Sequence, residues 1–246
     1  MDDQYVAGRN AVLETIKSGR EINKLWISEG AQKGSIQKII QAAKERQIVI
    51  QYVPRKKLDE MAKNHQGVIA QIAPYRYYDV DELFKRAEQN KEAPFFLILD
   101  EIEDPHNFGS LMRTADATGV HGIIIPKRRS VGLTTTVAKA STGAIEYVPV
   151  ARVTNLARSI DELKERGVWI CGTDAGADTD YRELDGTLPI AIVIGSEGKG
   201  ISRLIKEKCD FLVKLPMKGH VTSLNASVAG ALLMYEVYRK RDTAGR

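Results

Sequence analysis

The sequence IAIVIGSEGKG at 190–200, followed by FLVKLPMKGHVTSLNASVAG at 211–230, decides the fold. Each segment begins with a short apolar run, and the first is rich in β-branched residues, as is typical of a buried strand. Each run ends in a polar or glycine-rich loop, and the second loop leads into an Ala- and Leu-rich helix expected over 224–240. Ligands of parallel sheets bind at the carboxyl ends of the strands, so these two loops are the first places to search for chemistry.

The same pattern of short apolar runs recurs from residue 95 onward. Strands are expected at 95–99, 122–125, 147–150, 168–171, 190–194 and 211–215. Helical segments separate most of these runs, and such an alternation predicts a parallel sheet covered by helices on both faces. We therefore predict an α/β domain over 94–246.

The first 73 residues alternate helix and strand on a smaller scale and predict a separate small α/β domain. They hold 12 Lys and Arg against 8 Asp and Glu, a net charge of +4, whereas 74–246 hold 24 of each. A positive segment suits a polyanionic partner, although a solvated basic surface would have the same composition. The candidate RNA contacts are Arg9, Arg55, Lys56 and Lys57.

Residues 74–93 are predicted to link the two domains. Pro74 is followed by the tyrosine-rich sequence YRYY, which breaks the pattern, and a polar helix is expected at 80–90. Pro94 then precedes the first strongly apolar run.

Length and composition exclude several classes of protein. With 246 residues, of which 43% are hydrophobic and 28% charged, the chain can form one large domain or two modest ones. It has no apolar run of about 18 residues and its acidic start does not resemble a signal peptide, so we expect a cytoplasmic protein without a membrane partner. Cys171 and Cys209 lie in apolar runs without metal-ligand spacing, so buried thiols are expected and no metal site.

Polar residues in three loops are candidates for a site. After the strand at 95–99 we expect a long polar loop and then a helix at 110–118, so that Asn107 either caps that helix or faces the site. Arg113 would reach inward from the helix or form a surface pair with Asp116. At the last helix, Ser223 is expected to be the cap, which would leave Asn225 free to serve a ligand.

Two nucleotide-binding patterns are absent from the sequence. Neither G-x-G-x-x-G after the first strand nor G-x-x-x-x-G-K-[ST] occurs. The loop at 195–200 carries Glu197, whose carboxylate would repel a triphosphate, so a nucleoside triphosphate is not the expected ligand.

Three motifs together resemble those of the SpoU branch of the SPOUT methyltransferases. They are NFG at 107–109 with RTA at 113–115, IVIGSEGKG at 192–200, and LPM at 215–217 with SLNAS at 223–227. Residues 1–73 are similar to the small RNA-binding domain, of the ribosomal protein L-thirty type, that precedes the catalytic domain in bacterial enzymes methylating a guanosine ribose of 23S ribosomal RNA. The resemblance covers nearly the whole chain.

The resemblance implies a homodimer that transfers a methyl group from S-adenosylmethionine to a ribose 2′-hydroxyl of ribosomal RNA, without a metal. It also implies that the catalytic domain ends in a trefoil knot, which spacing alone cannot show. The implied catalytic residues are Arg113, Asn107, Glu197, Ser223 and Asn225. The implied cofactor contacts are Thr173, Gly195, Leu215, Met217, Ser223 and Leu224.

Within this reading, we interpret Arg113 as a cationic clamp because arginine is not deprotonated in proteins. Glu197 would hold its guanidinium by a bidentate pair, or would instead orient the start of the last helix. Two other functions stay open: a transfer-RNA ribose methyltransferase, and a non-catalytic RNA-binding or assembly protein.

Overall fold

The computed structural model describes residues 5–31, 34–221 and 223–244, and the chain divides into two units. Unit 1 comprises residues 1–76 with 132–135, and unit 2 comprises 77–131 with 136–246. The helix expected at 80–90 is present as α4 (Val80–Asn90), and its Leu83 lies in the core of unit 2. The segment from Tyr77 to residue 93, which we predicted as part of a linker, therefore packs as part of unit 2.

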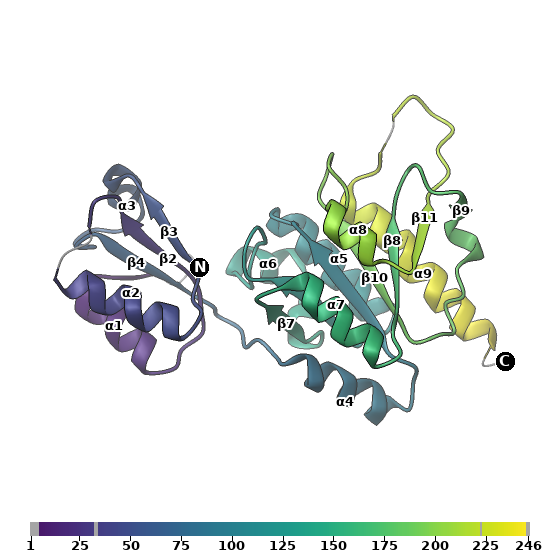
Figure 1. Cartoon of the computed structure of the whole chain (residues 1–246), viewed down its shortest axis with the longest axis horizontal. Coiled ribbons are helices and arrows are strands. Elements are labelled where there is room, and N and C mark those ends of the chain that lie inside the picture. The colour runs from purple at the N-terminus through teal and green to yellow at the C-terminus, as the bar shows by residue number, and fades with distance from the viewer. Residues whose placement is uncertain (1–4, 32–33, 222, 245–246) are drawn as a thin grey trace. The chain divides into compact units, whose positions relative to one another are not determined.

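In its described residues, unit 1 is a four-stranded sheet in the order β1-β4-β2-β3 with three helices (Figure 1). Its strands are β1 (Tyr5–Ala7), β2 (Ile22–Ser28), β3 (Ile50–Val53) and β4 (Val68–Ile72), and its helices are α1 (Arg9–Lys17), α2 (Ser35–Glu45) and α3 (Arg55–Met61). β2 and β3 are parallel, and the other two pairs are antiparallel. The helix–strand alternation predicted for 10–72 is confirmed, but β1 was missed because three residues are too few to show a period of two.

Unit 2 is built on a seven-stranded sheet in the order β7-β6-β5-β10-β8-β11-β9, in which every neighbouring pair is parallel. The strands are β5 (Phe95–Asp100), β6 (Gly122–Pro126), β7 (Val150–Val153), β8 (Trp169–Thr173), β9 (Thr179–Asp180), β10 (Ile190–Gly195) and β11 (Phe211–Lys214). Besides α4, the helices are α5 (Pro105–Ala117), α6 (Thr135–Ala140), α7 (Leu156–Glu165), α8 (Arg203–Lys208) and α9 (Ala226–Ala244), with 3-10 turns at Ala144–Glu146 and Tyr181–Glu183. Among the described residues, no helix is long and apolar enough to cross a membrane.

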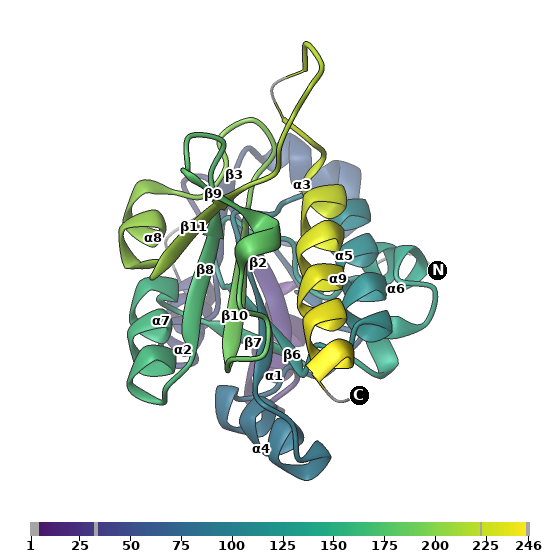
Figure 2. The same cartoon turned by 90° about the vertical axis from the view of Figure 1, so that its right-hand side faces the viewer.

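Helices cover both faces of this sheet, as predicted. Figure 2 shows α7 and α8 on one side of the strands and α5, α6 and α9 on the other. Side chains alternate along β5, so Phe96 and Ile98 join the core beneath α7 and α8, which contribute Ile160 and Ile205. The intervening side chains of β5 are buried on the opposite face.

Three expected boundaries were wrong for local reasons. α5 begins at Pro105 rather than at residue 110, because Asp104 accepts a hydrogen bond from the His106 amide (2.8 Å) and proline is favoured at the first helical position. The strand expected at 147–150 begins at Val150, because the chain is still leaving the 3-10 turn at Ala144–Glu146: the Tyr147 and Val148 amides both donate to the Ala144 carbonyl oxygen (3.0 Å). The last helix begins at Ala226, two residues later than expected, and extends to Ala244.

Candidate functional site

The carboxyl ends of three neighbouring strands, β6, β5 and β10, lie at one level of the unit 2 sheet. Gly195 of β10 is paired with Asp100 of β5, and Ile98 of β5 is paired with Ile124 of β6, which places Asp100 level with Pro126. The chain passes from β5 to β6 on one side, whereas β10 lies on the other side of β5. This reversal of strand order is where open α/β sheets bind ligands.

The loop after β10 is closed tightly on itself. Ser196 and Gly200 exchange two backbone hydrogen bonds, of 3.1 and 2.9 Å. A Cβ atom on Gly195 would lie 2.1 Å from the carbonyl carbon of Gly200, so only glycine fits there. Gly198 has a φ of 81°, a left-handed conformation that glycine adopts without strain. The glycines thus fold the loop so that Glu197 is held beside the end of β10.

Glu197 is bonded to two asparagines from different parts of the chain. The Nδ2 of Asn107, in the first turn of α5, donates to Glu197 Oε1 over 3.1 Å. The Nδ2 of Asn225 donates to Asn107 Oδ1 over 3.0 Å and also to Glu197 Oε1. Asn107 is buried. Three of the five predicted catalytic residues, one from each sequence motif, therefore form a single polar cluster.

Asn225 also caps α9, which corrects the expectation that Ser223 would do so. The Asn225 Oδ1 accepts hydrogen bonds from the amide of Ser227 (2.9 Å) and from the Ser227 hydroxyl (2.6 Å). Ser223 is exposed and lies three residues before the helix. An asparagine can do both jobs, because its carbonyl oxygen caps the helix while its amino group remains free to donate to Glu197.

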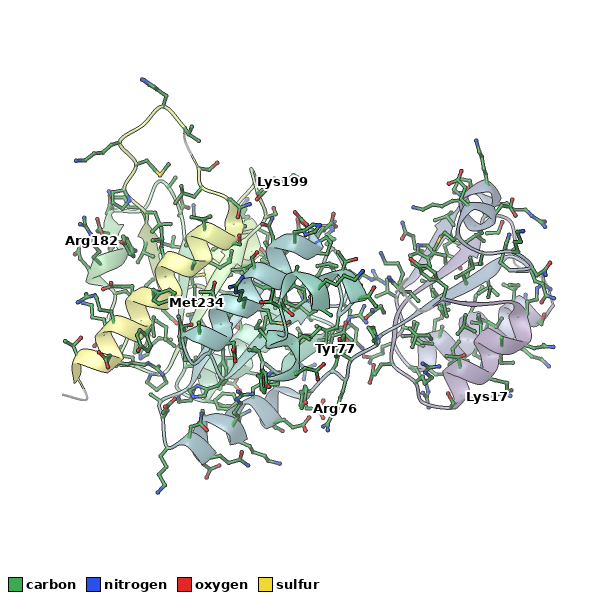
Figure 3. All side chains as sticks on the ribbon, turned by 180° about the vertical axis from the view of Figure 1, so that it is seen from behind. Lys17, Arg76, Tyr77, Arg182, Lys199 and Met234 are labelled. Carbon is green, nitrogen blue, oxygen red and sulfur yellow. The ribbon has the colours of Figure 1, made fainter. Side chains whose placement is uncertain are left out.

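Asn107 does not cap α5, because Asp104 does; the alternative that it faces the site is the one observed. Likewise Glu197 does not pair with Arg113 among the described contacts and instead accepts from Asn225, the residue that caps α9. Figure 3 shows Lys199, from the same loop as Glu197, near the beginning of α9, with Met234 farther along that helix.

Arg113 stands apart from the cluster. It lies six residues beyond Asn107 on α5, which is about 120° around the helix axis and about 9 Å along it. Its side chain is exposed and makes no hydrogen bond or ion pair with any other residue in the described part of the chain, Asp116 included. Arg113 shares a helix face with Gly109, whose position next to Ala140 directs this face toward the end of α6.

The predicted cofactor residues lie along the same edge of the sheet. Thr173 ends β8, Gly195 ends β10, and Leu215 directly follows β11. Leu215 and Leu224 are half-buried, whereas Met217 and Ser223 are exposed. The chain between β11 and α9 leaves the sheet in a long excursion (Figure 1). Apolar side chains therefore border both ends of this loop, Leu215 directly after β11 and Leu224 two residues before α9.

Asp100 is a site-forming residue that the sequence reasoning missed. It is buried, and its Oδ2 accepts a hydrogen bond of 2.7 Å from the Ser202 amide, just before α8. This bond ties the end of β5 to the chain that leaves the Glu197 loop. The sequence does contain a feature that points to Asp100, because this residue is the first polar one after a run of five apolar residues.

The four candidate RNA contacts of unit 1 fall into two groups. Arg55, Lys56 and Lys57 form the exposed first turn of α3 and have no ion-pair partner among the residues that the structure describes. Arg9 instead donates to the Gln66 carbonyl oxygen (3.0 Å) and to Ser35 Oγ (3.3 Å), so it holds α1, α2 and a loop together. Tyr52, 47% exposed on the edge strand β3 just before α3, is an aromatic neighbour that sequence reasoning did not select.

The cysteines have no chemical role in this arrangement. Burial raises the pKa of the Cys171 thiol to about 12 and that of Cys209 to about 11, so both stay protonated at neutral pH. Within the described ranges, no group of three or more His, Cys, Asp or Glu side chains could hold a metal ion.

Comparison with known families and proteins gives matches over the whole chain. A model of the SpoU rRNA Methylase family matches residues 94–235, and a model described as RNA 2′-O ribose methyltransferase substrate binding matches residues 5–78. A putative TrmH family tRNA/rRNA methyltransferase from Bacillus subtilis, YacO, is 67% identical over 242 residues, which cover 98% of this chain and 97% of that protein. A putative TrmH family tRNA/rRNA methyltransferase from Staphylococcus haemolyticus is 59% identical over 100% of this chain and 99% of its own.

Solved structures show the same fold. The SpoU methyltransferase AviRb from Streptomyces viridochromogenes, in complex with AdoMet, superposes with a TM-score of 0.63 at 24% identity, covering 97% of this chain and 90% of that one. The TrmH/SpoU tRNA modifying enzyme of A. aeolicus superposes with a TM-score of 0.56 at 30% identity, covering 66% of this chain and 86% of that one.

Proposed function

This chain belongs to the SpoU rRNA Methylase family, and we propose that it transfers a methyl group from S-adenosylmethionine to a ribose 2′-hydroxyl of RNA. The observation that carries the proposal is the cluster of Asn107, Glu197 and Asn225, which joins the three sequence motifs at the carboxyl edge of the sheet. A family neighbour whose structure contains AdoMet has the same fold.

The residues around the edge suit this cofactor. Leu215, Met217 and Leu224 supply apolar surface for an adenosine, and the main chain at Gly195, at the end of β10, supplies hydrogen-bonding groups for its edge. Thr173 and Ser223 add polar contacts beside them. When bound, the cofactor supplies an activated methyl group on a sulfonium, so the task left to the protein is to orient the ribose oxygen and assist the loss of its proton.

The polar cluster is the orienting part of this site. Glu197 is held by two amide donors, which fix its position beside β10, while its second carboxylate oxygen is available to a ribose hydroxyl. Because Asn225 also caps α9, the geometry of the cluster is coupled to the start of that helix.

Arg113 acts in this proposal as a clamp for negative charge. Arginine stays protonated, so it would stabilise the developing alkoxide and the adjacent phosphate while that phosphate or a water accepts the proton. The absence of a partner for Arg113 in the described chain is compatible with such a role, since its guanidinium is available to RNA.

We further propose that the target is a guanosine of 23S ribosomal RNA, read by unit 1. The match of residues 5–78 to a substrate-binding family and the exposed cations Arg55, Lys56 and Lys57 support an RNA role for this unit. Transfer RNA is the alternative target, because the printed names of the relatives include both classes of RNA. A non-catalytic assembly protein is less well supported, because such a protein would not need the Asn107–Glu197–Asn225 cluster.

A homodimer is part of the proposal because α9 presents an uncovered apolar stripe. Val228, Leu232, Tyr235 and Tyr238 are spaced at helical intervals and are between 40% and 51% exposed. Val228, Leu232 and Tyr235 line one groove together with Ser110 and Thr114 of α5. A second copy of the chain on this face would cover the stripe. The cytoplasmic location, the trefoil knot and the L-thirty likeness of unit 1 remain expectations that accompany this proposal.

The decisive experiment is methyl transfer from labelled S-adenosylmethionine to transcribed 23S ribosomal RNA and, separately, to transfer RNA. We expect 2′-O-methylguanosine after nuclease digestion of the ribosomal RNA, detected by mass spectrometry. Label in transfer RNA alone would show that transfer RNA, and not ribosomal RNA, is the substrate. Donor binding without label in either RNA would favour the non-catalytic alternative.

Donor binding is tested separately by calorimetry with and without a chelator. We expect equal affinity in both conditions. Leu224→Asp should abolish binding, because it would place an unpaired charge against the adenosine at a cost of several kcal/mol, the order of magnitude for a buried uncompensated charge. Binding that required a divalent ion, or was unchanged in Leu224→Asp, would contradict the assigned pocket.

A further inference from the structure

Unit 2 contains two runs of three consecutive cations, and the structure uses them differently. They are Lys127–Arg129, directly after β6, and Arg239–Arg241, near the end of α9. In the second run Arg241 donates to four backbone carbonyls, and Arg239 is paired with Glu236. In the first run Arg128 is exposed and has no hydrogen bond or ion pair with the described residues. Folding therefore accounts for the second run but not for Arg128.

The first run lies at the edge of the sheet that carries the candidate site. Pro126, the last residue of β6, is level with Asp100 and Gly195 across three adjacent strands. Because neighbouring strands are about 4.8 Å apart, the backbones that leave β6 and β10 begin about 10 Å from each other. The Lys127–Arg129 loop and the Glu197 loop thus flank the end of β5.

The backbone of this loop is braced on both sides. Its Lys127 amide donates to the Val153 carbonyl oxygen (2.8 Å), and Arg152 donates to the Lys127 carbonyl oxygen (3.3 Å). On the β5 side, Arg129 forms an ion pair of 2.8 Å with Glu101.

Both members of that ion pair have left-handed backbones, which are unfavourable for residues with a side chain. The φ angles are 59° for Glu101 and 54° for Arg129. Residues in such conformations persist where the surroundings enforce them, and they cluster at functional sites. The pair compensates the charge of Arg129 and fixes the loop, so that Arg128 is left as the uncompensated guanidinium.

We propose that Arg128 binds a backbone phosphate of the RNA next to the nucleotide that enters the site. The proposal rests on the proposed function and deepens it, because it assigns an RNA contact to unit 2 in addition to those of unit 1. Guanidinium groups bind phosphate by two parallel hydrogen bonds, and phosphate contacts set the position of a nucleic acid without reading its sequence. Arg128 is a positioning residue for the substrate and takes no part in the chemical step.

The test compares Arg128→Ala with Lys85→Ala in the full chain. Lys85 is also exposed and has no partner among the described residues, but it lies on α4, which contacts the opposite, amino edge of the sheet. Binding of a fluorescein-labelled RNA hairpin is measured by anisotropy over a series of salt concentrations. We expect Arg128→Ala to weaken binding roughly fivefold, the scale of one exposed ion pair, and Arg128→Glu to weaken it more.

The salt dependence gives a second readout that a structural defect would not produce. Loss of one phosphate contact should lower the slope of log affinity against log salt by about 0.7 to 0.9 in Arg128→Ala, and Lys85→Ala should leave it unchanged. Melting temperature and donor affinity should equal those of the unmodified chain. In steady-state methyl transfer, KM for RNA should rise while kcat at saturating RNA is retained.

The outcomes separate this proposal from the proposed function. Equal affinities and slopes in Arg128→Ala and Lys85→Ala would overturn the phosphate contact, while methyl transfer by the unmodified chain would still support the function. A lowered kcat with an unchanged salt slope would also overturn it. If the unmodified chain transferred no methyl group but the slope still fell in Arg128→Ala, the contact would stand and the function would fail.

Discussion

The two edges of the parallel sheet in unit 2 use similar polar side chains for opposite purposes. At the amino edge, Arg241 donates to the carbonyl oxygens of residues 93, 94, 186 and 188, and His121 bonds to the Phe95 amide and to Glu92. At the carboxyl edge, Asn107, Glu197 and Asn225 bond mainly to one another, and Arg113, about 9 Å farther along α5, has no partner among the described residues. Polar side chains at the amino edge form hydrogen bonds with backbone groups, whereas those at the carboxyl edge have hydrogen-bonding atoms that remain available to a ligand.

This difference leads to a simple expectation. Substitutions at the amino edge should lower stability with little effect on the chemistry of each folded molecule. Substitutions at the carboxyl edge should lower methyl transfer with little effect on stability. Each variant below is measured by both thermal unfolding and methyl transfer, so that the expected effect on stability and the expected effect on activity are tested separately.

The largest effect is expected for Arg241→Ala at the amino edge. The substitution removes four hydrogen bonds to partly buried carbonyl oxygens; the Pro94 oxygen keeps the Ile190 amide as a donor, but each oxygen left unsatisfied costs about 1–3 kcal/mol. We expect a loss of about 3 kcal/mol or more, which lowers the melting temperature of unit 2 by roughly 6–12 °C. Differential scanning calorimetry measures this shift.

Arg158→Ala is the control for that variant, because both partners of its ion pair with Glu162 on α7 are exposed. Its melting temperature should fall by far less, since exposed ion pairs contribute up to about 1 kcal/mol. Equal shifts in the two variants, or a loss of methyl transfer at temperatures where Arg241→Ala is folded, would break the comparison.

At the carboxyl edge, Arg113→Ala should lower single-turnover methyl transfer roughly 100-fold, the scale of removing one electrostatic stabiliser. Arg113→Lys keeps the charge without the two-pronged geometry, so its rate should be intermediate. Melting temperature and donor affinity should be unchanged in both variants. Higher pH should partly rescue Arg113→Ala, because it supplies more of the alkoxide that the clamp would otherwise stabilise.

The pH profile also separates the clamp from a base. A flat profile in Arg113→Ala, or equal rate losses in the alanine and lysine variants, would favour arginine as the proton acceptor. A drop in melting temperature would show that Arg113 has a structural partner and belongs with the amino-edge residues.

Asn225 sharpens the comparison because it serves both purposes at once. Asn225→Ala removes the α9 cap and the donor to Glu197, so we expect a stability loss of about 1 kcal/mol together with slower methyl transfer. Asn225→Ser keeps an oxygen that can cap but has no amino group. Its melting temperature should approach that of the unmodified chain while its methyl-transfer rate stays as low as that of the alanine variant. Recovery of both properties in the serine variant would mean that capping is the whole role.

Much of this fold could be predicted because its strands are short, buried and continuously apolar. Such runs locate β5, β6, β8, β10 and β11 to within one or two residues. Since parallel strands end at the same edge, the loops after the strands could be chosen in advance as the place to search, and the family resemblance then grouped Asn107, Glu197 and Asn225. The strand β1 was missed because its pairing with β4 is a long-range contact that three residues do not reveal.

What could not be predicted is which groups each side chain contacts. The spacing of Ser223 and Asn225 fits a helix start at either residue, and only the fold shows that α9 begins after Asn225. Arg9 was chosen for its charge, but the position of the loop at Gln66 engages it internally. A sequence specifies the position of charges along the chain, whereas the tertiary structure determines which of them are neutralised.

The smallest expected effect concerns His121 and the pH dependence of the amino edge. Burial lowers the pKa of His121, an effect that Arg241 and Arg86 reinforce and the Glu92 carboxylate opposes. In the unfolded chain this ring gains a proton as pH falls below about 6.5, whereas in the folded chain it stays neutral to lower pH. The unfolded state then binds more protons, so this contribution to stability is fully present above about pH 7.5 and is progressively lost as pH falls.

His121→Gln tests this contribution, because it retains an oxygen that can accept from the Phe95 amide but cannot titrate. We therefore expect the melting temperature of the unmodified chain to fall more steeply than that of His121→Gln between about pH 7.5 and 5, while methyl transfer at neutral pH is equal. Carboxylates titrate in both proteins and cancel in the difference. If the melting temperatures of the two proteins changed with pH in parallel across this range, protonation of His121 would be no more costly in the folded chain than in the unfolded one.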